Sequence, residues 1–104
     1  MVSIEHILPQ NPTENSTWCI DYTEDERREL LHKIGNLCII GRKKNTSLGN
    51  LDYQDKRKRY FEKNIGNFAR TLKIYNDYSN HWLPSDLLQN MNNTIKDIRD
   101  MFEV

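Results

Sequence analysis

Four short groups of polar residues, all in the first two thirds of the chain, carry the side chains that could do chemistry. In chain order they are Ile4-Glu5-His6-Ile7-Leu8-Pro9, Gly35-Asn36-Leu37, Asn45 followed by Ser47-Leu48-Gly49-Asn50, and Lys56-Arg57. A neutral imidazole can take a proton from water near pH 7, and carboxylate and amide oxygens suit Mg²⁺ or Mn²⁺ better than Zn²⁺. Basic side chains can contact phosphates. Together, these side-chain types could activate a water molecule, bind a cation and contact a phosphate.

Each of these residues also has a purely structural interpretation. His6 alone could be a hydrogen-bonded histidine on a half-buried strand, and Asn36 could be a turn residue at the end of a helix. Asn45 could be a helix N-cap, and Asn50 is more typical of a cap than of a ligand. His32 could line a site, or it could pack in the core or on the surface.

Length and composition limit the class of protein. The chain has 104 residues, 15 basic and 15 acidic, so its formal net charge is zero and one small domain is expected. Cys19 and Cys38 are too few for a disulfide framework or a metal knuckle, which favours a reducing cytoplasm. No apolar stretch is long enough to span a membrane, and no secretory signal is expected at the N-terminus.

The zero net charge hides an uneven distribution along the chain. Residues 1–31 hold seven acids and two bases, whereas residues 42–63 hold eight bases and three acids, a net charge of +5. A solvated helix face is the simpler interpretation of such a basic segment, although it could bind a polyanion locally. The candidates for phosphate contacts in this segment are Lys44, Lys56 and Arg57.

Two short strands are expected around the first two polar groups. Residues 4–8 alternate apolar and polar side chains, and residues 36–40 form a second apolar run. The composition of residues 10–21 is typical of a loop, from which Trp18 and Ile20 are expected to fold back as apolar anchors.

A helix is expected between the two strands. Thr23-Glu24-Asp25-Glu26 has the form of a capping box, so the helix should begin there. It should end at Gly35, in the position of a left-handed C-cap.

Three more helical segments are predicted in the second half of the chain. The first, at 52–62, should turn Tyr53, Tyr60 and Phe61 towards a core, and the second covers 72–78. The last begins near Pro84, and its apolar residues recur at helical spacing. That stripe, expected in the core together with Trp18 and Trp82, consists of Leu87, Leu88, Met91, Ile95, Ile98 and Phe102.

The four polar groups resemble the motifs of the HNH (His-Me finger, ββα-metal) endonuclease superfamily. More closely, they resemble the C-terminal nuclease domain of GmrSD-type modification-dependent restriction enzymes. That family's pattern reads Ile-Glu-His-Ile-Leu-Pro-Gln, Leu-His-Arg-Ile/Leu-Gly-Asn-Leu, Asn-x-x-Leu-x-Asn and Lys-Arg. Here the second motif is Leu31-His32-Lys33-Ile34-Gly35-Asn36-Leu37, and the agreement covers about residues 4–60.

The resemblance implies a role for each central residue. His6 would be the general base, and Asn36 would hold its imidazole in orientation. Glu5 and Asn45 would be the ligands of a divalent metal, Mg²⁺ or Mn²⁺. Because adjacent residues on a regular strand point to opposite faces, Glu5 and His6 can share a site only if the strand bends or twists at its end.

The fold class expected is therefore α+β: a metal-nuclease finger with short antiparallel strands at about 4–62, followed by additional helices at about 66–104. The resemblance implies a metal-dependent DNA endonuclease that restricts modified foreign DNA. It also implies that the chain is a fragment of a longer protein whose N-terminal domain hydrolyses nucleotide and senses the modification. A homodimer would supply two active sites for cutting a duplex.

A catalytically inactive finger that binds DNA or a partner protein is the alternative hypothesis, and a purely structural module is a third.

Overall fold

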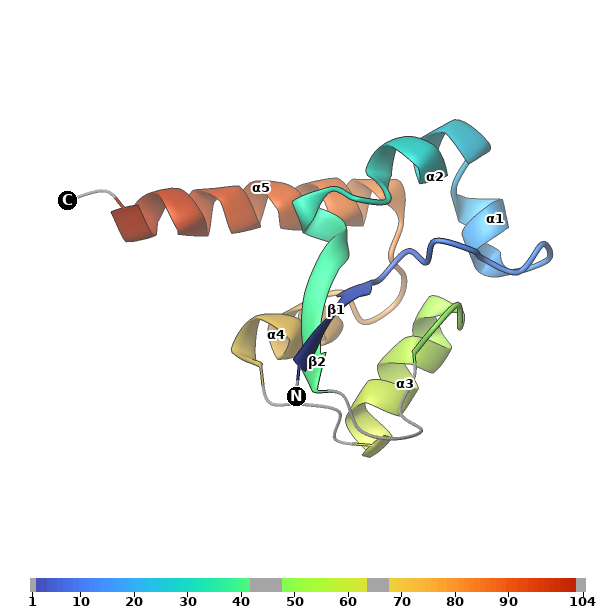
Figure 1. Cartoon of the computed structure of the whole chain (residues 1–104), viewed down its shortest axis with the longest axis horizontal. Helices are drawn as coiled ribbons and strands as arrows, with labels where there is room; N and C mark the ends of the chain where they lie inside the picture. The colour runs from blue at the N-terminus through green and yellow to red at the C-terminus, as the bar shows by residue number, and fades with distance from the viewer. Residues whose placement is uncertain (1, 42–47, 64–67, 103–104) are drawn as a thin grey trace.

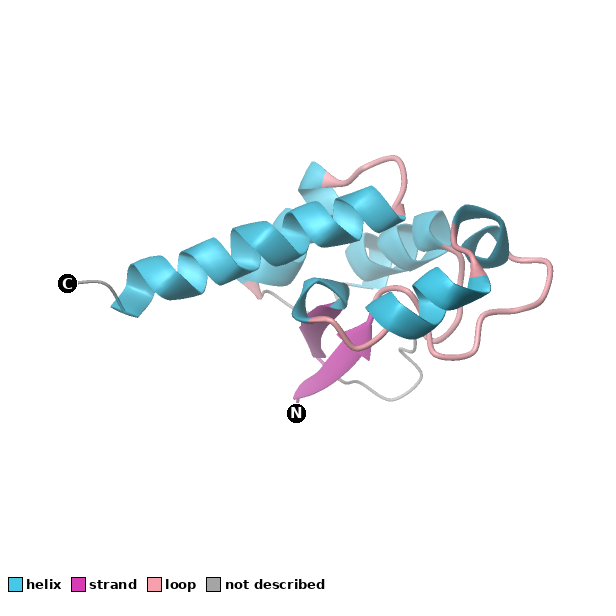
Figure 2. Cartoon of the chain, turned by 90° about the horizontal axis from the view of Figure 1, so that it is seen from above, coloured by secondary structure: helices cyan, strands magenta, loops and turns pink. Residues whose placement is uncertain are grey.

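The computed structural model describes residues 2–41, 48–63 and 68–102 of the chain. These residues have the α+β fold expected, with helices packed around one sheet of two antiparallel strands (Figures 1 and 2). The elements in chain order are β1 (Val2–His6), α1 (Thr17–Asp21), α2 (Glu24–Leu30), the 3₁₀ turn η1 (Ile34–Asn36), β2 (Leu37–Gly41), α3 (Tyr53–Lys63), α4 (Ala69–Asp77) and α5 (Pro84–Phe102).

The sheet pairs β1 with β2 so that His6 lies opposite Leu37 at one end. β1 begins and ends two residues earlier than the strand predicted at 4–8. The reason is that Ile7 and Leu8 are fully buried and leave the sheet. The backbone N–H of Ile7 still donates to the carbonyl of Asn36 (2.9 Å), so the pairing extends one hydrogen bond beyond His6 before Leu8 enters the core.

The segment predicted as a loop at 10–21 contains the short helix α1. Trp18 is buried as expected, and its indole Nε1 donates to the carbonyl of Leu51 (2.8 Å). The prediction for Ile20 was wrong, since 77% of this side chain is exposed. Residues two positions apart on a helix point in different directions, so α1 can bury only one of the pair.

The capping box is confirmed at the start of α2: Thr23 accepts from the N–H of Glu26, and Glu26 accepts from the N–H of Thr23. The C-cap predicted at Gly35 was wrong, because α2 ends at Leu30 and Gly35 lies within η1. A Cβ at Gly35 would stand 2.5 Å from the carbonyl oxygen of Leu87 and 2.5 Å from Cβ of Met91. This position therefore needs glycine because α5 crosses it closely, not because it closes a helix.

Aromatic rings form the centre of the core. Tyr53 of α3 lies between Tyr75 of α4 (ring centroids 5.8 Å apart) and Trp82 (5.9 Å apart), stacked on both. The Tyr22 hydroxyl donates to the carbonyl of Trp82 and links the C-terminal end of α1 to the same cluster. Tyr53 and Tyr60 face the core as predicted, and so do Trp18 and Trp82. Phe61 does not, since 39% of it is exposed.

The buried side chains of helix α5 lie in its first half. Leu87 is buried, and the buried amide of Asn90 donates to the carbonyl of Gly35 (2.9 Å). The prediction that the whole apolar stripe lies in the core was wrong, because Ile98 is 42% exposed and Phe102 is 78% exposed. The second half of the helix runs beyond the rest of the chain (Figures 1 and 2). No helix among the described residues is both long and apolar enough to cross a membrane.

The close crossing at Gly35 makes a stability prediction. We expect Gly35→Ala to lower the free energy of unfolding by about 1–3 kcal/mol, because the added methyl group meets backbone and Cβ atoms of α5 that cannot move independently. Denaturant unfolding measures this change. Asn92→Ala on the exposed side of α5 is the control and should stay within about 0.5 kcal/mol of the wild type. Equal stability of the two variants would contradict the tight crossing.

Candidate active site

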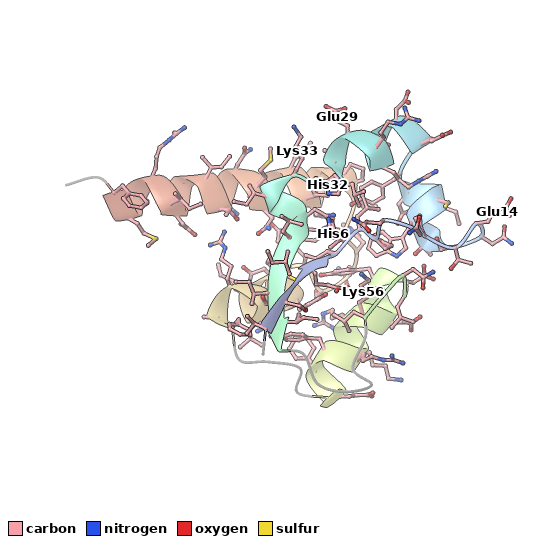
Figure 3. All side chains as sticks on the ribbon, in the orientation of Figure 1. His6, Glu14, Glu29, His32, Lys33 and Lys56 are labelled. Atoms are coloured by element: carbon pink, nitrogen blue, oxygen red, sulfur yellow. The ribbon has the colours of Figure 1, made fainter. Side chains whose placement is uncertain are left out.

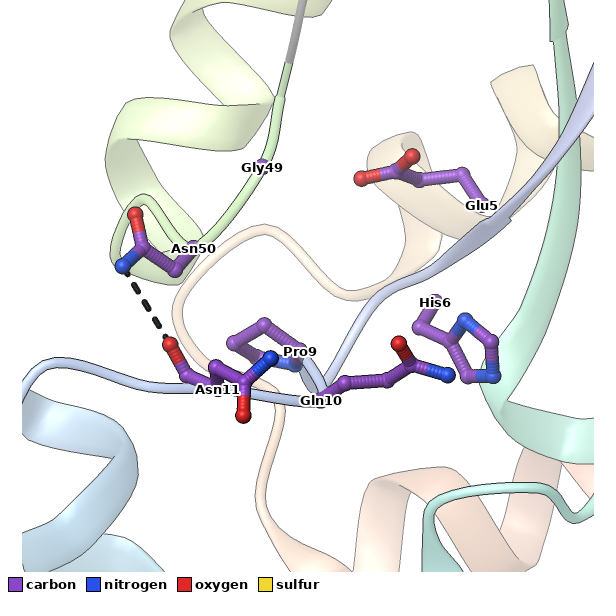
Figure 4. A pocket seen from close by; sticks show the side chains of 7 residues that line it. All are labelled: Glu5, His6, Pro9, Gln10, Asn11, Gly49 and Asn50. Atoms are coloured by element: carbon purple, nitrogen blue, oxygen red, sulfur yellow. Dashed lines mark hydrogen bonds between the residues drawn. The ribbon is translucent and has the colours of Figure 1, made fainter.

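A cavity of about 400 Å³ opens at the end of β1 (Figure 4). One wall is the strand end and the chain that follows it, and the other is the turn that precedes α3. The residues that line it are Glu5, His6, Pro9, Gln10, Asn11, Gly49 and Asn50. The first and third polar groups of the sequence, about forty positions apart, thus meet at one place.

Glu5 and His6 both border this cavity although they are adjacent in the strand. His6 is the last residue of β1, and the buried residues after it turn the backbone away from the sheet. The Glu5 carboxylate is directed towards the turn at Gly49, and the Gln10 side chain extends towards the His6 ring (Figure 4). The strand end therefore provides the change of direction that the pair requires.

Lys56 of α3 contacts this strand end. Its side chain is fully buried, and its ammonium group donates to the carbonyl of His6 (2.9 Å) and to Oε1 of Glu5 (3.4 Å). Burial lowers the pKa of Lys56, and the Glu5 carboxylate opposes that shift. A buried ammonium group has no exposed surface for a phosphate, so the DNA contact predicted for Lys56 does not agree with its position. Instead, Lys56 binds the Glu5 carboxylate and the His6 carbonyl and fixes both.

Asn36, the last residue of η1 directly before β2, is buried behind the strand end. Its Nδ2 donates to the carbonyls of Leu8 (3.0 Å) and Leu31 (2.9 Å). Its Oδ1 accepts from the backbone N–H of Leu8 (2.7 Å) and from the indole of Trp82 (3.3 Å). These four bonds use the full capacity of the amide, so Asn36 fixes the backbone that follows His6 and does not touch the imidazole.

The imidazole of His6 meets a second imidazole instead. His6 Nε2 lies 3.1 Å from Nδ1 of His32, with the ring centroids 5.2 Å apart and the rings nearly perpendicular. Partial burial is the main cause that lowers the pKa of His6 below 6.5, and His32 and Lys56 add to it, whereas Glu5 opposes it. His6 is therefore neutral near pH 7, as a general base must be. The sequence did not decide whether His32 lines the site or packs elsewhere. Its position in the second motif, directly after Leu31, was the signal that could have indicated a place near His6.

The other predicted site residues lie elsewhere or outside the described part of the chain. Arg57 is half-buried, donates from Nε to the carbonyl of Tyr75 (2.7 Å) and sits over the ring of Phe61, so it does not line the cavity. Asn45 and Lys44 fall outside the described residues. Asn50 donates to the carbonyl of Asn11 (3.2 Å), which ties the two cavity walls together (Figure 4).

The oxygen atoms at the cavity that could bind a metal ion belong to one carboxylate and to side-chain amides. The described residues contain no group of three or more His, Cys, Asp and Glu side chains that could hold a metal ion. The cavity offers the carboxylate of Glu5 and the amides of Gln10, Asn11 and Asn50. One carboxylate with amide, water and phosphate oxygens fits Mg²⁺ or Mn²⁺ and not Zn²⁺.

The lowered pKa of His6 predicts how stability depends on pH. In the folded chain His6 binds a proton less readily than in the unfolded chain, whose imidazole titrates near 6.5. Protonation therefore favours the unfolded state, and the wild type should lose stability relative to His6→Gln as pH falls below 6.5.

Melting temperatures of both proteins from about pH 7.5 to about pH 5 measure this difference, in which the shared titrations cancel. The difference should level off only well above 6.5, where the imidazole of the unfolded chain is also neutral. A wild type that gains stability relative to His6→Gln on acidification would contradict the environment described for His6.

Comparison with known proteins identifies the family of the chain. The family model described as "GmrSD restriction endonucleases, C-terminal domain" matches residues 1–92. No curated protein and no solved structure matches this chain. The match spans most of the chain and includes every residue that lines the cavity. The chain therefore belongs to the family of C-terminal domains of GmrSD restriction endonucleases.

Proposed function

We propose that this domain is an HNH-type endonuclease that hydrolyses DNA phosphodiester bonds with a divalent metal ion and with His6 as general base. Family membership connects the chain with a restriction endonuclease. The observation that carries the proposal is the placement of the Glu5 carboxylate and the neutral His6 imidazole on one cavity. An anionic metal ligand beside a neutral base is the combination that hydrolysis of a phosphodiester requires.

His6 takes a proton from the attacking water. Its Nε2 is engaged with His32, so Nδ1 is the nitrogen that accepts the proton. The oxygen of that water bonds to phosphorus as the bond from phosphorus to the leaving oxygen breaks. Lys56 and Asn36 keep the ring in place, the first through the His6 carbonyl and the second through the backbone of Leu8.

The metal is assigned to Glu5 and Asn45. Mg²⁺ usually binds through one or two carboxylates together with substrate phosphate, so a single carboxylate in the cavity is enough for a site completed by DNA. When bound, the ion supplies positive charge to the phosphate and the leaving oxygen. Contacts along the DNA backbone are assigned to Lys44 and Arg57. Lys56 is not assigned such a contact, because its ammonium group is buried.

The biological role proposed is restriction of foreign DNA with modified bases, in the cytoplasm. Recognition of the modification and nucleotide hydrolysis are assigned to an N-terminal domain of the full-length protein. Two copies of the domain, brought together as a homodimer, would cut the two strands of a duplex.

A second candidate function is an inactive finger that binds DNA or a partner protein. It is favoured by the contact between Glu5 and Lys56, because a cation 3.4 Å from the carboxylate competes with a metal ion for the same charge. The two functions differ in one measurable property, metal-dependent cleavage.

Nicking of supercoiled plasmid in Mg²⁺ or Mn²⁺ tests the proposal. We expect cleavage that a chelator blocks and that His6→Ala reduces by at least about 10²-fold, because the general base is lost. His81→Ala is the matched control: this histidine is exposed, contacts Asp86 (2.6 Å) and lies away from the cavity, so its loss should leave cleavage unchanged.

Plasmid that the wild type binds but does not nick in either metal would favour the inactive finger. Cleavage that His6→Ala retains would contradict the role of His6.

A further inference from the structure

The contact between His6 and His32 joins two separate parts of the fold. His6 ends β1, whereas His32 lies between α2 and η1, 26 positions later in the chain. Figure 3 shows the two labelled residues close together at this junction. His32 is exposed and fills no part of the core, so packing does not explain why its Nδ1 lies 3.1 Å from His6 Nε2.

A hydrogen bond between two neutral imidazoles has only two arrangements. In one, His6 carries its proton on Nε2 and donates it to Nδ1 of His32, and Nδ1 of His6 keeps a free electron pair. In the other, His32 donates from Nδ1, and the proton of His6 must sit on Nδ1. Only the first arrangement leaves His6 able to accept a proton from water.

The same arrangement becomes stronger during the proposed reaction. When His6 has taken a proton on Nδ1, it is an imidazolium whose Nε2–H donates a charge-assisted hydrogen bond to His32. An interaction that strengthens as charge develops stabilises the transition state more than the ground state. In the opposite arrangement two N–H groups would face each other once His6 is charged, and the contact would become repulsive.

We propose that His32 is a positioning residue that holds His6 in its Nε2-protonated form, with Nδ1 free to act as the base. The proposal deepens the nuclease function and rests on it. The charged groups around the pair are Glu5 on the same strand and Lys56 on α3; neither bonds to the His6 ring in the described part of the chain. The hydrogen bond that can select a tautomer of His6 in the described residues is therefore the one with His32.

Two substitutions at position 32 separate the hydrogen bond from the ring contact. His32→Phe keeps an aromatic ring against His6 but removes the nitrogen, and His32→Asn removes the ring but offers an amide oxygen near the place of Nδ1. We expect His32→Phe to lower kcat for plasmid nicking by about 10- to 100-fold with little change in KM. His32→Asn should recover part of that loss. His81→Phe is the control for a surface histidine and should leave kcat unchanged.

The ¹⁵N NMR spectrum of the His6 ring gives a readout that does not depend on cleavage. In the wild type near neutral pH we expect a protonated Nε2 and an unprotonated Nδ1, and in His32→Phe a mixture of the two tautomers. Equal melting temperatures of the wild type and both variants would show that folding is not the cause, as the exposure of His32 predicts.

The outcomes keep the two proposals apart. If His6-dependent cleavage occurs but His32→Phe changes neither kcat nor the tautomer, the role of His32 is overturned and the nuclease function stands. If the wild type cleaves no DNA, the nuclease function is overturned, and the ring spectra alone decide whether His32 sets the tautomer. A wild-type His6 protonated on Nδ1 would overturn the inference in either case.

Discussion

A buried positive charge holds the candidate site together. The ammonium group of Lys56 has no exposed surface, so its charge must be met inside the protein, by the His6 carbonyl and the Glu5 carboxylate. Removing one partner of a buried ion pair leaves an uncompensated charge, which is why such pairs fix their neighbours firmly. Because Lys56 belongs to α3, whose preceding turn forms the other wall of the cavity, this contact also sets the two walls relative to each other.

Asn36 makes the complementary contribution from the side of β2. A carboxamide can donate twice and accept twice, and here two of the four bonds go to the backbone of Leu8, in the chain after His6, while the other two go to the carbonyl of Leu31 and the indole of Trp82. Lys56 thus fixes the carbonyl of His6, and Asn36 fixes the residue two positions later. Between them, His6 has little freedom to leave the cavity, and His32 contacts the ring itself. Preorganisation of this kind, built on buried polar groups, is what positions a catalytic side chain.

Local patterns in the sequence predicted much of the fold. The capping box, the α3 helix and the burial of Trp18 and Trp82 follow from short-range rules and are confirmed. What could not be predicted depends on contacts between distant segments. The need for glycine at position 35 comes from the crossing of α5, and the burial of Lys56 comes from β1, about fifty positions away. A basic run of residues looks the same in sequence whether its members face solvent or, like Lys56, are buried against a carboxylate from a distant strand.

A crystal structure of the domain with a DNA duplex and Mn²⁺, containing His6→Ala to prevent cleavage, tests most directly whether this cavity is where DNA is cut. The account predicts an anomalous peak for the ion on the Glu5 carboxylate, with a backbone phosphate beside it and the space left by the imidazole next to that phosphate. It would be contradicted by DNA bound to another face, with no ion in the cavity and the Glu5 carboxylate still paired only with Lys56.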